Sequence, residues 1–282
     1  MPARIESFRN DGLTFPVRDT GPLDGEVIVL LHGWPQTSSS WSAVAALLNE
    51  QGYRTIAPDQ RGFTPTALPR GRFNYRMDRL VGDVAELIGT IGAGQVHLVG
   101  HDWGAVVAWA TAIRSPELLR TLTAVSVGHS GAFMRALLSS KQALQSWYMF
   151  AFQAPWGAEL VARYRPQFFF GTLASTGMTK AQRDNVRTEI LDRGVLTGGL
   201  NWYRAMPLMA PKYLRGKVSV PTTFVWSDGD TAVGPKSADL TAEYVIGDYR
   251  FEALRGVSHW IPEEKPAELT ELITQRVLTN PR

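Results

Sequence analysis

An aspartate stands at the tip of a predicted strand-to-helix turn, in the segment Leu98–Trp109, which reads LVGHDWGAVVAW. A short apolar strand runs up to Gly100, and an apolar helix follows Gly104. This is the outline of a G-x-S-x-G nucleophile elbow, which lifts one side chain above a sheet and aims backbone N–H groups at it, but Asp102 takes the place of the serine. A lone aspartate before a helix usually caps it. Here the flanking glycines and the apolar strand favour a nucleophile.

A carboxylate nucleophile restricts the chemistry of the site. With a reference pKa of about 3.9 it is ionised at neutral pH and needs no base to activate it. Attack on an acyl carbon would give an anhydride, whereas attack on an sp³ carbon with a leaving group gives an ester that water can cleave. A serine in the same place would form an unreactive ether. Asp102 therefore predicts alkyl transfer followed by hydrolysis, with a base reserved for the second step.

We expect that base to be His259, one of five histidines. It stands in the loop GVSHWIPEEKP after the last predicted strand, where the chain order of nucleophile, acid and histidine requires it. The acid that orients it is Asp230 or Asp228, both in WSDGDTAVGP. We favour Asp230, which is deeper in the loop and precedes the apolar Ala232 and Val233, and Asp228 stays the alternative.

Two tryptophans follow the ends of the two central strands and would supply donors to a tetrahedral intermediate. The backbone N–H groups of Trp34, in LHGWP, and of Trp103 are expected to form an oxyanion hole. Losing one such donor typically costs about 10²–10³ in rate. His32, in the same turn as Trp34, has either a structural or a pocket-lining role. His97 is expected to be structural, and His101 to lie on the side of the strand opposite the nucleophile.

The elements that must position these residues alternate between strands and helices. A hairpin is expected at Ile5–Val17, with its turn at Asp11 and Gly12. Apolar runs predict strands at residues 26–33, 53–59, 95–100, 119–127 and 249–254, and a strand followed by a loop at residues 220–230. Apolar spacing and capping residues predict helices at 38–52, 77–94, 105–116, 235–245 and 265–278. This alternation predicts parallel strands with right-handed crossovers, which is an α/β layered fold.

The alternation lapses between about residues 131 and 216, where aromatic residues are dense and the pattern indicates helices and loops. We therefore expect an α/β core formed by residues 1–130 and 217–282. A mainly helical lid, residues 131–216, interrupts it.

Composition narrows the class of protein. Among 282 residues, 44% are hydrophobic and 20% are charged, which is ordinary for a soluble globular enzyme. The net charge is +3 and the basic residues are scattered, which argues against a nucleic-acid partner. The absence of cysteine excludes a thiol nucleophile, disulfides and Cys-ligated zinc. With no secretory leader and no apolar run of about 18 residues, the expected location is cytoplasmic, without a membrane span.

Taken together, these motifs resemble the epoxide hydrolases of the α/β-hydrolase fold, of the soluble type, over nearly the whole chain. The motifs that carry the resemblance are the H-G-x-P turn at His32–Pro35, the DQRGF segment at Asp59–Phe63, the GHDWG elbow, the acid loop and the final SHW. The resemblance implies that His32, Trp34 and Pro35 lie beside the substrate. Haloalkane and haloacetate dehalogenases share these core motifs, so alone they indicate the superfamily and not the substrate.

The lid separates the two classes. Trp147–Leu160 and Gly199–Met206 look like the two lid segments in which epoxide hydrolases carry paired ring-opening tyrosines, and the resemblance maps that pair onto Tyr148 and Tyr203. A phenol with a pKa of about 10 is a fitting proton donor to the alkoxide of an opened epoxide. The tyrosines that match no such segment and are expected to be structural are Tyr164, Tyr213 and Tyr244.

The resemblance implies hydrolysis of a small apolar epoxide by water to a vicinal diol, with no metal or organic cofactor. The alternative is a dehalogenase, although Trp34 stands where those enzymes usually have asparagine; Trp147, Trp156 or Trp202 could then serve from the lid. A third, less favoured reading is a non-catalytic protein that binds apolar ligands. A homodimer is possible.

Overall fold

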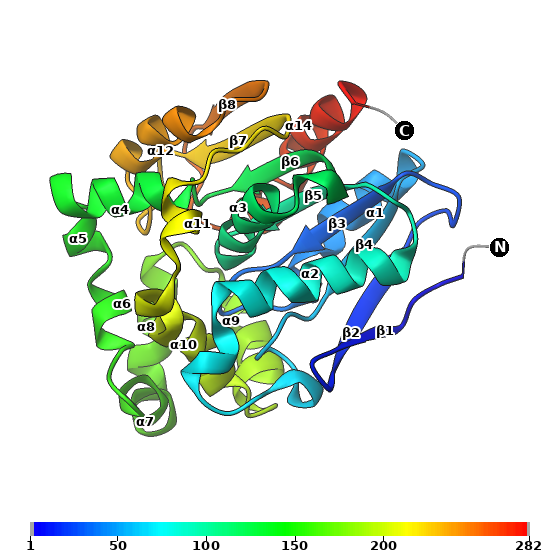
Figure 1. Cartoon of the computed structure of the whole chain (residues 1–282). Coiled ribbons are helices and arrows are strands. Elements are labelled where there is room, and N and C mark those ends of the chain that lie inside the picture. The colour runs from blue at the N-terminus through cyan, green and yellow to red at the C-terminus, as the bar shows by residue number, and fades with distance from the viewer. Residues whose placement is uncertain (1–2, 281–282) are drawn as a thin grey trace.

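The centre of the computed structural model, which describes residues 3–280, is an eight-stranded sheet (Figure 1). Its order is β1-β2-β4-β3-β5-β6-β7-β8. The strands are β1 (Ser7–Asn10), β2 (Leu13–Thr20), β3 (Val27–Leu31), β4 (Arg54–Pro58), β5 (Val96–His101), β6 (Leu119–Val125), β7 (Thr222–Ser227) and β8 (Tyr249–Leu254). β1 and β2 form the predicted hairpin and pair antiparallel, whereas the pairs from β4 to β8 are parallel.

Helices cover both faces of this sheet, which explains why its central strands are almost entirely buried and rich in apolar residues. In β3, Val27, Val29 and Leu31 pack into the core on one face, and Ile28 and Leu30 pack into the core on the other. On the first face lie α2 (Met77–Ile91) and α3 (Trp103–Arg114), and on the second lie α1 (Ser42–Glu50) and α14 (Pro266–Leu278). The core also contains α12 (Pro235–Thr241) and α13 (Ile261–Glu264).

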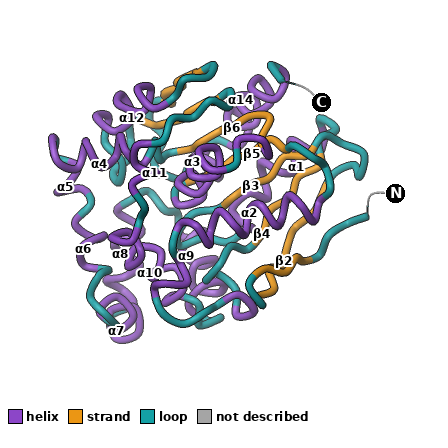
Figure 2. Tube along the Cα trace, viewed as in Figure 1, coloured by secondary structure: helices purple, strands orange, loops and turns teal. Residues whose placement is uncertain are grey.

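The chain between β6 and β7 is helical, as Figure 2 shows. Its α-helices are α4 (Ser130–Ser139), α5 (Gln142–Gln145), α6 (Trp147–Ala151), α7 (Gly157–Tyr164), α8 (Pro166–Ser175), α9 (Lys180–Val186), α10 (Leu196–Ala205) and α11 (Pro211–Arg215). A π-helical turn, Arg187–Leu191, follows α9. The helices lie beyond the carboxyl ends of the parallel strands, where β5 delivers Asp102 (Figure 1). The predicted fold, a mostly parallel sheet with an inserted helical lid, is therefore confirmed.

Candidate active site

Asp102 lies in the turn between β5 and α3, with a φ of 52° and a ψ of −119°. A positive φ is uncommon for a residue other than glycine. The turn is tight: a β-carbon on Gly100 would stand 2.2 Å from the carbonyl oxygen of Gly104, and one on Gly104 would stand 2.1 Å from that of Leu31. The Asp102 carboxylate makes no capping hydrogen bond to α3. The predicted elbow is thus present, and its side chain does not serve as an N-cap.

Backbone N–H groups hold the Asp102 carboxylate in place. Its Oδ1 accepts a 2.8 Å hydrogen bond from the N–H of Trp34. Gly33 allows this approach, because a β-carbon there would lie 2.4 Å from the Asp102 Cβ. Burial alone would raise the pKa of Asp102, but the hydrogen bond and the charge of His259, with the N–H of Trp103, hold it below its usual value. The N–H groups of both tryptophans therefore lie against the Asp102 carboxylate.

His259 joins the two aspartates. Its Nε2 lies 3.4 Å from Oδ2 of Asp102, and its Nδ1 lies 2.7 Å from Oδ2 of Asp230. The other Asp230 oxygen accepts hydrogen bonds from the N–H groups of Ala232 at 2.7 Å and Val233 at 2.9 Å. These bonds fix the Asp230 carboxylate against the imidazole.

Asp228, the alternative acid, lies elsewhere. Its side chain is exposed and accepts a 2.7 Å hydrogen bond from the N–H of Gly256. Of the two carboxylates in the loop, the structure brings Asp230 to His259.

Two opposing effects set the charge of His259. Burial lowers the pKa of the imidazole, but the charges and hydrogen bonds of Asp230 and Asp102 outweigh it and raise the pKa to about 10. In the resting site His259 is therefore protonated at neutral pH, between two carboxylates.

The backbone of His259 is anchored by two side chains that the sequence analysis did not single out for this purpose. Its carbonyl oxygen lies 2.9 Å from Nε2 of His101 and accepts a 2.8 Å hydrogen bond from Oγ of Ser126. Burial is the largest effect on His101 and lowers its pKa to about 4, so its ring is neutral and Nε2 carries the proton toward the carbonyl. His101, expected on the side of the strand opposite the nucleophile, thus holds the backbone of the loop that carries His259.

The two predicted lid tyrosines meet beside Asp102. Tyr148 comes from α6 and Tyr203 from α10, and their ring centroids are 6.0 Å apart at 76°. Tyr203 also packs edge-on against Trp103, with centroids 5.1 Å apart. Burial raises the pKa of both phenols well above the usual value, and the negative charge of Asp102 raises it further. Both hydroxyls are therefore protonated at neutral pH and can donate.

Two apolar cavities flank this centre. The first, about 410 Å³, lies against α4 and α11, with Phe133 and Leu214 in its wall. The second, about 320 Å³, lies against α7 and α8, with Val161 and Leu173 in its wall. The residues that line both are Asp102, Tyr148, Tyr203 and Ala232, while His259 lines the second. The reactive groups thus stand between two spaces for apolar substituents.

The H-G-x-P turn contributes less than the resemblance implied. Trp34 lines the second cavity, but His32 and Pro35 line neither. Nδ1 of His32 lies 2.9 Å from the carbonyl oxygen of Gly33, and Nε2 accepts a 3.0 Å hydrogen bond from the N–H of Gln60. Because both ring nitrogens bond to backbone, the structure favours the structural role for His32 over the pocket-lining one.

The three tyrosines that were expected to be structural lie away from the cavities. Tyr213 donates a 2.6 Å hydrogen bond to Asp78, Tyr244 stacks on His129 with centroids 4.2 Å apart, and Tyr164 is exposed. Within residues 3–280, no cluster of three or more His, Asp or Glu side chains is arranged to hold a metal ion. In the same range, no helix has the length and apolarity to cross a membrane.

Residues 26–266 match the family described as alpha/beta hydrolase fold. The chain belongs to this family. It is 30% identical to epoxide hydrolase 4 of Homo sapiens, over 94% of this chain and 76% of the relative. It is 32% identical to the AB hydrolase superfamily protein YfhM of Bacillus subtilis, over 96% and 97% of the two chains.

Solved structures give the same result. The crystal structure of a Bacillus megaterium epoxide hydrolase in complex with an inhibitor superposes with a TM-score of 0.82 at 26% identity, covering 96% of this chain and 99% of the other. The resemblance to epoxide hydrolases predicted from the sequence is therefore confirmed.

Proposed function

We propose that the protein hydrolyses apolar epoxides to vicinal diols in two steps, through an ester on Asp102. The observation that carries this proposal is the pair of protonated phenols, Tyr148 and Tyr203, that the lid places beside the elbow carboxylate between two apolar cavities.

In the first step, Oδ2 of Asp102 attacks one epoxide carbon, and the bond from that carbon to the ring oxygen breaks. The hydroxyls of Tyr148 and Tyr203 donate hydrogen bonds to the oxygen as negative charge develops on it, and one of them transfers its proton. Hydrogen bonds to charged groups are about twice as strong as neutral ones, so the phenols stabilise the transition state more than the bound epoxide. The product of this step is a hydroxyalkyl ester.

The second step follows from a change in charge. Esterification removes the negative charge of Asp102, one of the two carboxylates that raise the pKa of His259. The pKa of the imidazole therefore falls. The proton that His259 releases returns to the tyrosine that gave up its proton in the first step. Neutral His259 then takes a proton from water, whose oxygen attacks the ester carbonyl carbon. The N–H groups of Trp34 and Trp103 hold the resulting oxyanion. Collapse breaks the ester bond, and the departing alkoxide takes the proton from His259 to give the diol. The carboxylic acid left on Asp102 then passes its proton to His259, which restores the resting carboxylate and the protonated imidazole.

The lid tryptophans do not favour the dehalogenase alternative, which needs an N–H donor for the halide. The indole N–H of Trp202 donates a 2.7 Å hydrogen bond to the carbonyl oxygen of Arg61. Trp147 and Trp156 are 55% and 70% exposed. Trp34 lies outside the lid and lines the second cavity; its indole nitrogen is buried and has no hydrogen-bond partner among the described residues, so of these tryptophans it is the one whose N–H stays available to a halide.

We further propose that the chain divides into a core of residues 1–130 and 217–282 and a lid of residues 131–216. The helix α4 begins within one residue of the first boundary, at Ser130, and α11 ends at Arg215. We also propose that the protein is cytoplasmic and that its substrates are a small apolar epoxide and water.

The test replaces Asp102 and measures diol formation from a styrene-type and an aliphatic epoxide. Asp102→Asn and Asp102→Ala are expected to abolish turnover, and the alanine variant guards against slow conversion of the amide to aspartate. Asp228→Asn is the matched control, because Asp228 belongs to the acid loop but is exposed and bonds only to Gly256 among the described residues. Diol production by Asp102→Ala at the wild-type rate would refute the nucleophile. Halide release from bromoalkanes with every epoxide left intact would replace the proposal with a dehalogenase.

A further inference from the structure

Large hydrophobic side chains gather on the outside of the lid. Of the thirteen that are exposed in the described part of the chain, eight lie between residues 138 and 168. The six that define what we call the lid face are Trp147, Phe150, Trp156, Leu160, Tyr164 and Phe168. Their helices, α6, α7 and α8, lie together at the lower left in Figures 1 and 2, and α7 packs on α8. Soluble monomers rarely expose apolar groups so closely grouped without a binding role.

The helix α7 is apolar on its outer side. Trp156, which precedes it, and Leu160 and Tyr164 within it are spaced four residues apart, so they form one stripe. They are 70%, 53% and 66% exposed. Trp156 has a φ of 62°, a left-handed conformation that bulky side chains rarely adopt. Neither this backbone nor this exposure benefits folding, which indicates that the tryptophan is held outward for binding.

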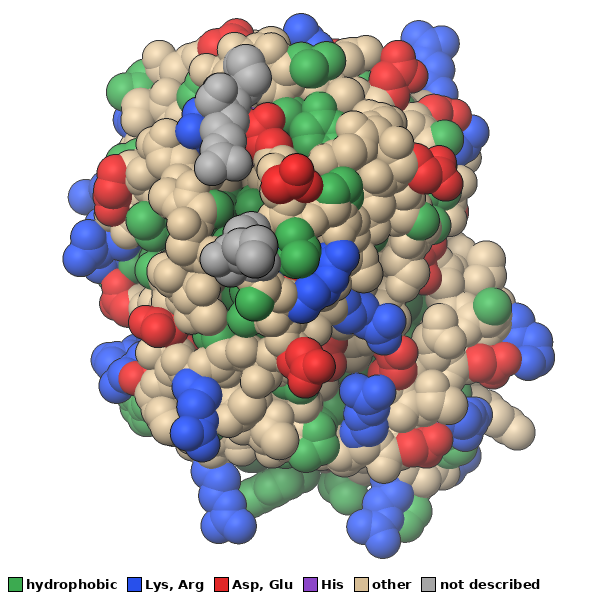
Figure 3. Space-filling model, turned by 90° about the vertical axis from the view of Figure 1, so that its right-hand side faces the viewer, with side chains coloured by type: hydrophobic (Ala, Val, Ile, Leu, Met, Phe, Trp, Pro, Cys, Tyr) green, Lys and Arg blue, Asp and Glu red, His purple; other side chains and the backbone are tan. Residues whose placement is uncertain are grey.

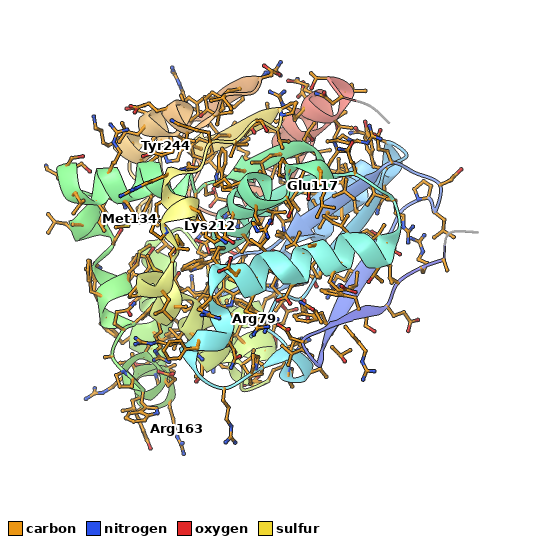
Figure 4. The ribbon with its side chains drawn as sticks, in the orientation of Figure 1. Arg79, Glu117, Met134, Arg163, Lys212 and Tyr244 are labelled. Carbon is orange, nitrogen blue, oxygen red and sulfur yellow. The ribbon has the colours of Figure 1, made fainter. Side chains whose placement is uncertain are left out.

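The lid is also the basic part of the chain. Residues 130–216 carry eleven Lys and Arg against four Asp and Glu, a net charge of +7, whereas the rest of the chain carries eighteen against twenty-two, a net charge of −4. On α7, Glu159 is paired with Arg204 at 2.8 Å, which leaves Arg163 exposed next to Tyr164. Figure 4 shows Arg163 at the outer end of α7, pointing away from the protein. Along the lower edge of Figure 3, hydrophobic side chains protrude between Lys and Arg side chains.

The lid face is continuous with both cavities. Phe150 is 61% exposed and lines the first cavity. Trp147 and Phe168 are 55% and 64% exposed and line the second. An apolar molecule could therefore pass from a surface in contact with the lid face to the cavities along hydrophobic side chains.

We propose that the lid face docks reversibly on a lipid surface that carries anionic headgroups. Tryptophan and tyrosine favour the boundary between headgroups and acyl chains, and leucine and phenylalanine favour the apolar side of it. Lys and Arg near the surface are attracted to anionic lipid, an interaction that extends over about one Debye length. The protruding aromatic stripe lies in a segment, residues 130–216, whose net charge is +7. This combination fits an anionic surface better than it fits a second copy, whose equally basic lid would repel the first. The docking does not depend on the proposed function.

The test measures co-sedimentation of the full chain with phosphatidylcholine vesicles, with and without phosphatidylglycerol. We expect binding to vesicles with the anionic lipid, weaker binding to neutral vesicles and release by salt. A variant with Trp156→Ser, Leu160→Ser and Tyr164→Ser is expected to lose at least about tenfold in binding, since each removes an anchor of the kind that drives interfacial binding. Its matched control carries Ile246→Ser and Leu278→Ser, at positions 70% and 64% exposed outside the lid.

The charge is tested in the same way. Arg163→Ser is expected to weaken binding to anionic vesicles, whereas Lys236→Ser, an exposed lysine on α12, is expected to leave it unchanged. None of the replaced residues lines a cavity, so all variants should fold and keep their turnover of soluble substrate. The proposal is overturned by absence of binding to anionic vesicles, by equal binding of the triple variant and its control, or by a stable dimer that the triple variant breaks.

Discussion

Replacing both lid tyrosines by phenylalanine tests the step that separates an epoxide from a halide. Tyr148→Phe and Tyr203→Phe remove only the two hydroxyls. The ring contacts that hold the pair, Tyr148 on Phe152 at 5.7 Å and Tyr203 on Trp103 at 5.1 Å between centroids, remain possible for phenylalanine. A change in rate then reports on the hydroxyls and not on packing.

The size of the effect follows from the charge on the epoxide oxygen. A hydrogen bond to a charged group contributes about 1.5–3 kcal/mol, and 1.36 kcal/mol is tenfold in rate, so each single variant should lose about 10- to 150-fold in the alkylation step. The double variant also loses the proton donor and should lose about 10²–10⁴-fold or more if the two hydrogen bonds are independent. Hydrolysis of the ester uses His259 and backbone donors, so its rate should change little.

The assay mixes excess enzyme with epoxide and follows the loss of substrate in a single turnover. Tyr164→Phe is the matched control, because Tyr164 lies in the lid, is exposed and lines neither cavity. If the double variant alkylated as fast as Tyr164→Phe, the tyrosine pair would have no part in ring opening, and the reasoning from the lid to the substrate would be wrong.

Three further predictions concern the base. In the His259→Gln variant the reaction should stop at the ester. Because ring opening expels no group, the intact mass of the protein should rise by the whole mass of the epoxide. Formation of diol by this variant would contradict the role of the base. The pKa of His259 is raised from 6.5 to about 10 in the folded protein, so its contribution to stability is fully present below pH 6.5 and is lost as the pH rises through about 10. In urea denaturation, the difference in unfolding free energy between wild type and His259→Gln should therefore shrink as the pH rises from 6.5 to about 10. A difference that stays constant with pH would argue against the raised pKa. Ser126→Ala removes one of two donors to the His259 carbonyl and should slow ester hydrolysis by about 2- to 10-fold, with alkylation unchanged, since a neutral hydrogen bond contributes about 0.5–1.5 kcal/mol. Ser237→Ala is its control: that buried hydroxyl has no hydrogen-bond partner as donor or acceptor among the described residues, and no effect on either step is expected.

The fold was predictable because its determinants are local in the sequence. A strand covered on both faces is mostly apolar, and the run that became β3 is apolar at every position. The run that became β5 is buried throughout and is apolar apart from His97 and His101. The elbow was predictable for a similar reason, since only glycine fits at positions 100 and 104 of so tight a turn. Chain order then indicated His259, because the superfamily's histidine follows its acid.

What the sequence could not supply depends on contacts between distant segments. The support of the His259 carbonyl joins it to His101 and Ser126, 158 and 133 residues away, and no local pattern marks such a contact. The role of His32 was open for the same reason, because it depends on where the N–H of Gln60 lies. The two cavities arise from gaps between lid helices and core, which spacing along the chain does not determine.

The geometry of displacement explains why the substrate class resides in the lid. A nucleophile attacks a saturated carbon from the side opposite the bond that breaks, so the epoxide oxygen must point away from Asp102 as it leaves. The core offers its donors, the N–H groups of Trp34 and Trp103, on the side of the carboxylate itself, where in the proposed mechanism they serve the ester carbonyl and not the leaving oxygen. Donors to that oxygen must come from across the cavity, and the helices α6 and α10 bring Tyr148 and Tyr203 there. In the proposed mechanism an elbow with aspartate therefore leads to an alkyl ester, and the groups that the lid places opposite it determine which leaving group can be accepted.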